Sequence, residues 1–347
     1  MESVTTLAPS CSRRVICFSL LCAIGSLLIS FLAAEFILRI MGYGGAPQTM
    51  VTNVYPVDDP ILDWRTLPNS EYKEGGVLYK YNSSGFRDVE HAVVKPSGVT
   101  RIVVLVDSVS EGLGFEAKDT FSYVLQSELG DKFEVINIVA RALNTPQEIH
   151  LFEKEGLKYK SDLVILNFVL NDSDFYSSLE NARRAEAENE SKMFLFGISI
   201  NPKLKRLLKS SAAVYFVHQR VHELKSKLMG MDEQDYYTDL WKKQENRLKV
   251  INAFDKLALL RKQDRFEVMI IIWPLITDYE HYGLAFVHNW LTKEAETRGF
   301  MSVDLLPIFS KFPWEDLRLT TDDNIHPNGL GHKLAVASFL SWYRSLK

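Results

Sequence analysis

The sequence predicts an α/β protein, a three-layer αβα sandwich with a five-stranded parallel sheet, preceded by one N-terminal transmembrane helix. Two features predict this fold: five apolar runs of strand length separated by helix-like stretches, and one long uncharged run near the N-terminus. Apolar runs without alternation are typical of parallel strands that helices cover on both faces. The five runs are residues 101–106, 134–139, 163–168, 268–273 and 301–305.

The uncharged run comprises residues 15–34, twenty in all. As a helix it is long enough to cross the roughly 30 Å hydrocarbon layer of a membrane. Arg13 and Arg14 precede it, whereas Glu35 and Arg39 after it cancel in charge. Because basic residues favour the cytoplasmic side, we expect residues 1–14 to be cytoplasmic, residues 15–38 to be a single-pass signal anchor in the cell membrane, and the rest to be exported.

A cleaved signal peptide and a buried core helix are the alternative interpretations of this run. The run is long for a signal peptide, and Phe31 and Leu32 spoil small-residue cleavage sites ending at Ala33 or Ala34. In a bacterium, an anchored domain of this orientation would be periplasmic or extracytoplasmic.

The composition argues against several classes of function. The net charge of −4 and the absence of a basic stripe indicate that nucleic acid is not a partner. The three cysteines, Cys11, Cys17 and Cys22, all lie at the N-terminal end, so no disulfide framework or cysteine metal site is expected in the remainder of the chain. No glycine-rich phosphate motif follows a predicted strand, and the four-residue spacing of His218 and His222 lacks a third metal ligand.

Two further segments complete the predicted organisation. Residues 39–99 are rich in proline, glycine, asparagine and aspartate and predict a linker followed by an irregular or β-rich lead-in. Residues 100–347 form the α/β domain. Within it, residues 179–265 are charged and helix-favouring, which predicts a helical insertion between the third and fourth strands. It could be a lid, a partner surface or a solvated excursion without a direct role.

Polar residues follow the predicted strands at the edge where open α/β sheets bind ligands. Ser108 comes directly after the first strand, and Asn171 follows the third. Asp323 and His326 are three residues apart near the C-terminal helix, close enough for the carboxylate to hold the imidazole in one tautomer. Each has an ordinary structural explanation, since serine caps helices and Asx turns are common. Together they predict a serine nucleophile with a histidine base.

In this order along the chain, these motifs resemble the SGNH, or GDSL-like, hydrolase superfamily. The resemblance covers residues 100–347, and residues 81–87 look like the lead-in of exported members. It implies a flavodoxin-like sheet and assigns Ser108 as nucleophile, His326 as base and Asp323 as its orienting partner. It further implies an oxyanion hole made by the Ser108 N–H, the Ala142 N–H and the Asn171 amide, with no metal or cofactor.

The sequence departs from the family at three glycines, which are replaced by Val106, Ala142 and Val169. Alanine keeps the N–H donor but does not readily adopt a positive φ, so the oxyanion geometry is the feature at risk. Val106 and Val169 are expected at strand ends, where extended backbone tolerates a side chain.

The resemblance implies a serine esterase that works through an acyl-enzyme and deacylates O-acetylated cell-surface carbohydrate. Its partners would be an acylated small-molecule or carbohydrate substrate and, through the N-terminal helix, the membrane. Two alternatives stay open: transfer of the acyl group to a polysaccharide hydroxyl, and a catalytically degenerate domain that binds a glycan or a protein partner.

Overall fold

The computed structural model describes residues 13–41, 53–74, 76–139, 143–170, 208, 210–214, 216–217, 220–221, 233–320 and 323–345. The chain forms two compact units. The first comprises Met1–Pro47 and Glu190–Lys225, and the second comprises Gln48–Asn189 and Ser226–Lys347.

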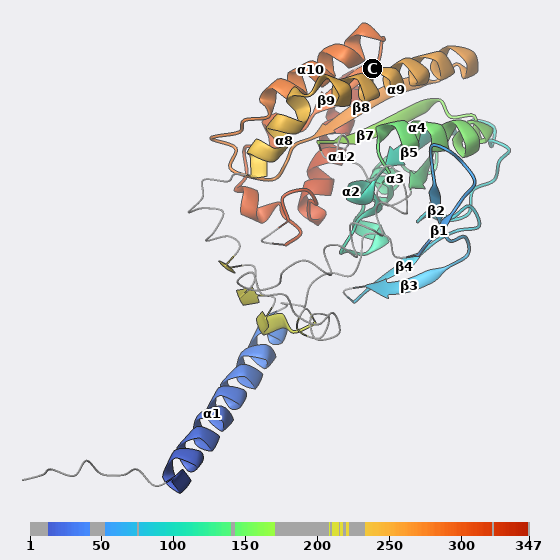
Figure 1. The fold of residues 1–347 in the computed structure, drawn as a ribbon. Coiled ribbons are helices and arrows are strands. Elements are labelled where there is room, and N and C mark those ends of the chain that lie inside the picture. The colour runs from blue at the N-terminus through green and yellow to red at the C-terminus, as the bar shows by residue number, and fades with distance from the viewer. Residues whose placement is uncertain are drawn as a thin grey trace, which may run out of the picture. The chain divides into compact units, whose positions relative to one another are not determined.

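A five-stranded parallel sheet forms the centre of the second unit (Figure 1). Its order is β6-β5-β7-β8-β9, and every neighbouring pair is parallel. The predicted α/β fold is therefore confirmed. The strands are β5 (Thr100–Val106), β6 (Phe133–Val139), β7 (Leu163–Val169), β8 (Glu267–Trp273) and β9 (Met301–Asp304).

Helices cover both faces of this sheet (Figure 1). On one side α3 (Phe121–Leu129) packs against α12 (Gly329–Ser345). On the other, α9 (Gln244–Asp264) contacts both α4 (Thr145–Leu151) and α10 (Ala285–Thr297). All seven residues of β7 are buried, which is why its sequence is continuously apolar apart from one asparagine.

Shorter helices connect these layers. They are α2 (Ser108–Glu111), α8 (Glu233–Lys242), α11 (Leu306–Phe309), the 3₁₀ turns η1 (Ala117–Asp119), η3 (Leu157–Tyr159) and η4 (Trp314–Asp316), and the π-helical turn η2 (Phe152–Gly156). α8 and α9 occupy the C-terminal part of the predicted insertion at 179–265. Its first part, up to residue 207, lies outside the described residues.

The strand order reverses beside β5. The chain passes from β5 to β6 on one side and then returns to β7 on the other. In doubly wound sheets the crevice at such a reversal, outside the carboxyl ends of the strands, is where ligands bind. The loops that follow β5 and β7 are therefore placed where a site is expected.

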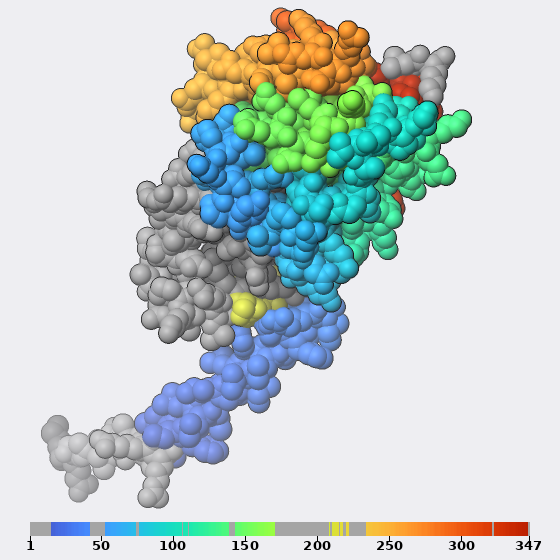
Figure 2. Space-filling model, turned by 90° about the vertical axis from the view of Figure 1, so that its right-hand side faces the viewer, coloured from blue at the N-terminus to red at the C-terminus, as the bar shows by residue number. Residues whose placement is uncertain are grey.

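Before the sheet, the lead-in forms two antiparallel hairpins. β1 (Val54–Pro56) pairs with β2 (Trp64–Thr66), and β3 (Glu71–Glu74) pairs with β4 (Val77–Lys80). Arg65 forms an ion pair with Glu155 at 2.8 Å, and His150 Nε2 lies 2.9 Å from an Asp59 carboxylate oxygen. Figure 2 shows the lead-in, in light blue to cyan, as one continuous surface with the green residues around α4 and β7.

The lead-in also covers the β6 edge of the sheet. The backbone N–H of Asn137 on β6 donates to Asp88 at 2.6 Å. Arg101 is fully buried, and its guanidinium donates to Glu134 on β6 and to the backbone carbonyls of Ala92 and Val93. A buried cation is tolerated only with such partners, so these contacts fix the lead-in against the sheet.

Among the described residues of the first unit, the long helix is α1 (Arg13–Ile40). Its stretch Val15–Ile40 has a mean hydropathy of 2.6, and none of its most apolar window is buried. The helix is long and apolar enough to cross a membrane, a property that an N-terminal signal sequence shares.

Candidate active site

Ser108 begins α2, immediately beyond the carboxyl end of β5. The chain leaves the strand through Asp107, whose extended backbone and side chain cap the short helix by accepting the Val109 N–H at 2.8 Å. The helix ends after one turn at Gly112, which has a φ of 79°. A Cβ there would lie 2.4 Å from Thr120 Cγ2, so both the conformation and the space require glycine.

This tight turn presents the serine hydroxyl to a histidine from the far end of the chain. His326 Nε2 lies 2.9 Å from Ser108 Oγ, although the two residues are 218 positions apart in sequence. The other ring nitrogen, Nδ1, lies 2.8 Å and 3.0 Å from the two carboxylate oxygens of Asp323. The structure thus brings together the three residues that the sequence singled out at β5 and before α12.

Asp323 also shapes the loop that carries the histidine. Its Oδ1 accepts the backbone N–H groups of Ile325 at 3.0 Å and of His326 at 2.8 Å. The same carboxylate therefore makes both the Asx turn, which accounts for the Asp-x-x-His spacing, and the contact to the imidazole ring.

Other parts of the chain hold this loop in place. Asn324 O accepts the N–H of Ile276 from the loop after β8, and His326 O accepts the N–H of Leu319. Asn328 caps α12 by accepting the Leu330 N–H at 2.9 Å. These contacts limit how far the imidazole can move from Ser108.

Burial and hydrogen bonding have opposite effects on the pKa values of the two carboxyl groups near Ser108, those of Asp107 and Asp323. Burial would raise the pKa of Asp323, but the hydrogen bonds and charge of His326 and the nearby backbone N–H groups lower it below its usual value. Burial raises the pKa of Asp107 to about 6 despite its bond from the Val109 N–H. At neutral pH Asp323 is thus the firmly ionised partner of the imidazole.

A second set of contacts, which the sequence did not reveal, holds α2 from the lead-in side. The buried Arg87 donates through Nη1 to the carbonyls of Glu111 and Gly112, both at 2.7 Å, and through Nη2 to that of Phe115 at 2.8 Å. Its guanidinium lies 4.1 Å from the ring centroid of Tyr79 on β4. Arg87 stands at the end of the 81–87 motif, but only the fold shows that it caps the turn bearing Ser108.

Tyr81 reinforces this contact. Its hydroxyl donates to the carboxylate of the fully buried Glu111 at 2.5 Å. The ring also stacks with Tyr72, at a centroid distance of 6.1 Å. The β3–β4 hairpin is therefore attached to the helical turn that carries the serine.

Several sequence-based candidates cannot be placed. Ala142 and Asn171, the expected oxyanion donors, lie outside the described residues, as do His218 and His222. The two valines at family glycine positions are described: Val106 is the last residue of β5 and Val169 the last of β7. Both stand in strands, as expected, where a side chain is compatible with the extended backbone.

His332, on the first turn of α12, is fully buried beside the site. Its ring lies 5.3 Å from that of Trp273 and 4.9 Å from that of Phe115, measured between centroids. Neither ring nitrogen has a hydrogen-bond partner among the described residues. Burial, with a smaller contribution from the charge of His326, lowers the pKa of His332 to about 3, so this imidazole is uncharged at neutral pH.

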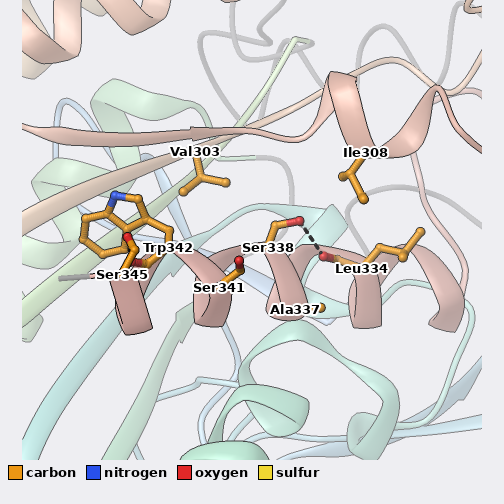
Figure 3. Close-up of a pocket in the computed structure, with 8 residues that line it drawn as sticks. All are labelled: Val303, Ile308, Leu334, Ala337, Ser338, Ser341, Trp342 and Ser345. Carbon is orange, nitrogen blue, oxygen red and sulfur yellow. Dashed lines mark hydrogen bonds between the residues drawn. The ribbon is translucent and has the colours of Figure 1, made fainter. Parts of the chain in front are cut away.

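Two other features lie apart from these residues. Asp278, Glu280 and His281 bring ligand atoms within 4.8 Å of one another, but all three are exposed and the histidine is paired with Asp278 at 2.7 Å. An apolar groove runs along α12 and is drawn in Figure 3. It is lined by Val303, Ile308, Leu334, Ala337, Ser338, Ser341, Trp342 and Ser345 and contains none of the predicted site residues.

No protein-family model matches the chain, and no curated protein matches it in sequence. Solved structures resemble its fold. The acetyl xylan esterase AlAXEase is 14% identical, with 70% of this chain and 98% of that chain covered and a TM-score of 0.40. A member of the lipolytic protein G-D-S-L family from Veillonella parvula is 12% identical, with 71% of this chain and 99% of that chain covered and a TM-score of 0.41.

A GDSL-like lipase from Bacteroides thetaiotaomicron is 14% identical, with 72% of this chain and 89% of that chain covered and a TM-score of 0.39. At such identities and TM-scores, however, the neighbours' activities say nothing about this chain, whose function has to be argued from its own residues.

Proposed function

We propose that this chain is a serine esterase in which Ser108, His326 and Asp323 form a catalytic triad. The observation that carries the proposal is the hydrogen-bonded line from Ser108 Oγ through His326 Nε2, at 2.9 Å, to the Asp323 carboxylate, at 2.8 Å from Nδ1. A serine hydroxyl is a weak nucleophile until a base removes its proton, and an imidazole held in one tautomer by a carboxylate supplies that base.

In the first half of the reaction Ser108 Oγ attacks the ester carbonyl carbon while its proton passes to His326 Nε2. Asp323 accepts the Nδ1–H and stabilises the imidazolium that forms. The tetrahedral intermediate then collapses, and the proton moves from Nε2 to the departing alkoxide. An acyl-enzyme on Ser108 and a free alcohol result.

In the second half, water attacks the acyl carbon with His326 again acting as base, and Ser108 recovers its proton. The oxyanion formed in each half requires donors. We assign the Ser108 N–H, which is at the first position of α2 and so has no acceptor within that helix, together with the Ala142 N–H and the Asn171 amide.

We further propose that the substrate is an O-acetylated carbohydrate of the cell surface and that α1 anchors the domain to the membrane, with residues 1–14 in the cytoplasm. The shape and composition of α1 support an anchor, and the two arginines before it support the orientation.

The triad is tested by labelling the detergent-solubilised full chain with a fluorophosphonate, which reacts with activated serines. We expect wild type to be labelled and Ser108→Ala and His326→Ala to be unlabelled. Ser338→Ala, a change at another half-buried serine, serves as the matched control and should label like wild type. A folded wild-type protein that takes no label would instead favour the binding-domain alternative.

The acceptor is tested separately with an acetylated oligosaccharide. Hydrolysis releases free acetate at a rate proportional to the enzyme concentration. An acyltransferase instead moves the acetyl group to an added unacetylated sugar, and the mass of that sugar increases. Both outcomes must disappear in Ser108→Ala if the triad carries the reaction.

A further inference from the structure

Residues 274–284, the β8 loop, connect β8 to α10 and are bonded to the loop that carries the proposed base. The Ile276 N–H donates to the Asn324 carbonyl at 2.7 Å, and Asn324 stands two residues before His326. A displacement of the Ile276 peptide would therefore be passed to the loop that presents the imidazole to the serine.

The neighbouring peptide of the β8 loop is held by a tyrosine hydroxyl. The Leu275 N–H donates to the Tyr282 hydroxyl at 3.1 Å, and this hydroxyl lies 3.0 Å from Nε2 of His288 on α10. Leu275 and Ile276 are buried, so their N–H groups depend on partners within the protein. Tyr282 thus closes the β8 loop on itself at the point where the loop meets Asn324.

A buried histidine fixes the Tyr282 hydroxyl in turn. His288 is 1% exposed, and its Nδ1 lies 2.7 Å from a carboxylate oxygen of Asp304, the last residue of β9. Because the carboxylate accepts the Nδ1–H, Nε2 has a lone pair for the Tyr282 O–H, and the phenol oxygen accepts the Leu275 N–H. Burial raises the pKa of Tyr282 well above 10, so the hydroxyl keeps the proton that it donates.

The two ends of the β8 loop have further bonds. At its far end, the buried Gln234 on α8, within the predicted insertion, accepts the Gly283 N–H at 2.8 Å. At its near end, the Ile276 carbonyl accepts Arg318 Nε at 2.7 Å. Arg318 also forms a β-bridge with Pro327, the residue after the proposed base. Bonds at both ends of the loop therefore converge on the backbone around the imidazole.

We infer that Tyr282 is a positioning residue for the proposed reaction. It holds the β8 loop in the conformation in which the Ile276 N–H reaches Asn324. It thereby keeps the imidazole of His326 within bonding distance of Ser108. The inference rests on the proposed esterase function and deepens it, because it names what keeps the base in place.

The test compares Tyr282→Phe with Tyr279→Phe in the detergent-solubilised full chain. Both changes remove one hydroxyl from the β8 loop, and the two rings lie 6.1 Å apart between centroids. The Tyr279 hydroxyl is buried without a hydrogen-bond partner among the described residues, so its removal breaks no such bond. A difference between the two variants therefore reports the bonds of the Tyr282 hydroxyl.

Labelling by a fluorophosphonate is followed over time, because its rate constant depends on attack by Ser108, whereas its end point counts the folded, active molecules. We expect Tyr282→Phe to label completely but about tenfold more slowly than wild type, since a small displacement of the base is enough. The kcat for a water-soluble ester should fall by a similar factor with KM unchanged. Tyr279→Phe should match wild type in all of these quantities.

His288→Asn provides a second variant. Its amide can still donate to Asp304 but is too short to reach Tyr282 as well. Because the Leu275 N–H keeps its acceptor, labelling should slow less than in Tyr282→Phe. If Tyr282→Phe does not fold, His288→Asn decides the question through the same rate constant and end point.

A Tyr282→Phe variant that labels at the wild-type rate would overturn the inference and leave the esterase standing. A lower end point at that rate would show that the hydroxyl only stabilises the fold. Equal slowing in Tyr279→Phe would also overturn it, because the bonds of Tyr282 would then not be the cause. A wild-type chain that takes no label refutes the proposed triad itself, and the inference with it.

Discussion

The two ring nitrogens of His326 have different partners, and this difference gives each neighbouring residue its proposed role. Nδ1 is directed at the Asp323 carboxylate, so Nε2 is left to accept the proton of Ser108. The carboxylate also holds the loop backbone through the N–H groups of Ile325 and His326. One side chain therefore sets both the tautomer and the position of the base.

Replacing Asp323 with asparagine should separate these two tasks. The amide oxygen can keep the backbone bonds, but the amide cannot stabilise the imidazolium, so we expect kcat to fall about 10³–10⁴-fold with a folded protein. Ester hydrolysis and thermal unfolding of the variant measure the two effects. Asp255→Asn, at an exposed ion pair with Arg298, should leave both unchanged.

The lowered pKa of Asp323 adds a pH dependence. Since the folded-state pKa lies below the ordinary 3.8, the group contributes stability above about that pH and loses it as the pH falls through the folded value. Wild type and Asp323→Asn should therefore converge in stability in strong acid. A constant difference down to pH 2 would contradict the assigned ionisation.

His332 provides a second prediction for a single side chain. Its ring nitrogens lack partners among the described residues, so His332→Leu should raise the free energy of unfolding by about 1 kcal/mol at neutral pH. Folding lowers the pKa from 6.5 to about 3, so wild-type stability is complete above pH 6.5 and declines as the pH falls towards 3. The leucine variant should not share that decline, which reaches about 1.4 kcal/mol per pH unit.

Urea unfolding between pH 4 and 8 measures this difference. The matched control is His288→Leu, because His288 is equally buried but bonded to Asp304 at 2.7 Å and to the Tyr282 hydroxyl at 3.0 Å. That change strands two polar groups and should destabilise the protein by about 1–3 kcal/mol. If both variants lose stability alike, the His332 ring has a polar role.

The four-residue helix α2 is too short to be stable by itself, so its position depends on the elements around it. β5 delivers its first residue, and the lead-in holds its last turn through Arg87 and Tyr81. The β3–β4 hairpin is thereby a structural part of the site, although it lies outside the α/β sheet.

Arg87→Lys tests this dependence. Lysine keeps the charge, but its single nitrogen cannot replace the two guanidinium nitrogens that bond the three carbonyls, and it has no planar group to stack on Tyr79. We expect kcat to fall about tenfold to a hundredfold with KM little changed, because a shift of about 1 Å in a nucleophile is enough. Arg65→Lys is the matched control, since Arg65 also bonds a backbone carbonyl, that of Ser84, and a carboxylate, that of Glu155, neither of which belongs to α2. An equal loss in both variants would indicate general destabilisation.

At the level of the whole chain, the proposed triad lies entirely within the second unit, whereas α1 belongs to the first. A chain beginning at Gln48 should therefore be released from the membrane and hydrolyse a small water-soluble ester with unchanged kcat/KM. Flotation of vesicles and hydrolysis rates measure the two properties, with Ser108→Ala in the same truncated chain as the background. Loss of activity on truncation would show that α1 contributes to the fold of the site.

The five strands were predictable because each is a short, mainly apolar run, and each observed strand lies within one residue of its predicted bounds at both ends. The residues Ser108, Asp323 and His326 were predictable because each stands in a short motif beside a strand or helix end. Arg87, Glu111 and Ile276 were not, since a buried arginine, a buried carboxylate and a backbone N–H carry no distinctive local pattern.

The sequence alone determined the sheet, the apolar N-terminal helix and the identity of the three proposed catalytic residues, because hydrophobic periodicity and short motifs are local properties. Only the tertiary structure decided that Ser108 and His326 meet at 2.9 Å across 218 positions. It alone also decided that the lead-in caps α2 and that Glu35 caps the segment at 211–213. Such contacts join residues that are distant in sequence. Which residues meet depends on how the whole core packs, and not on the residues next to them in the chain.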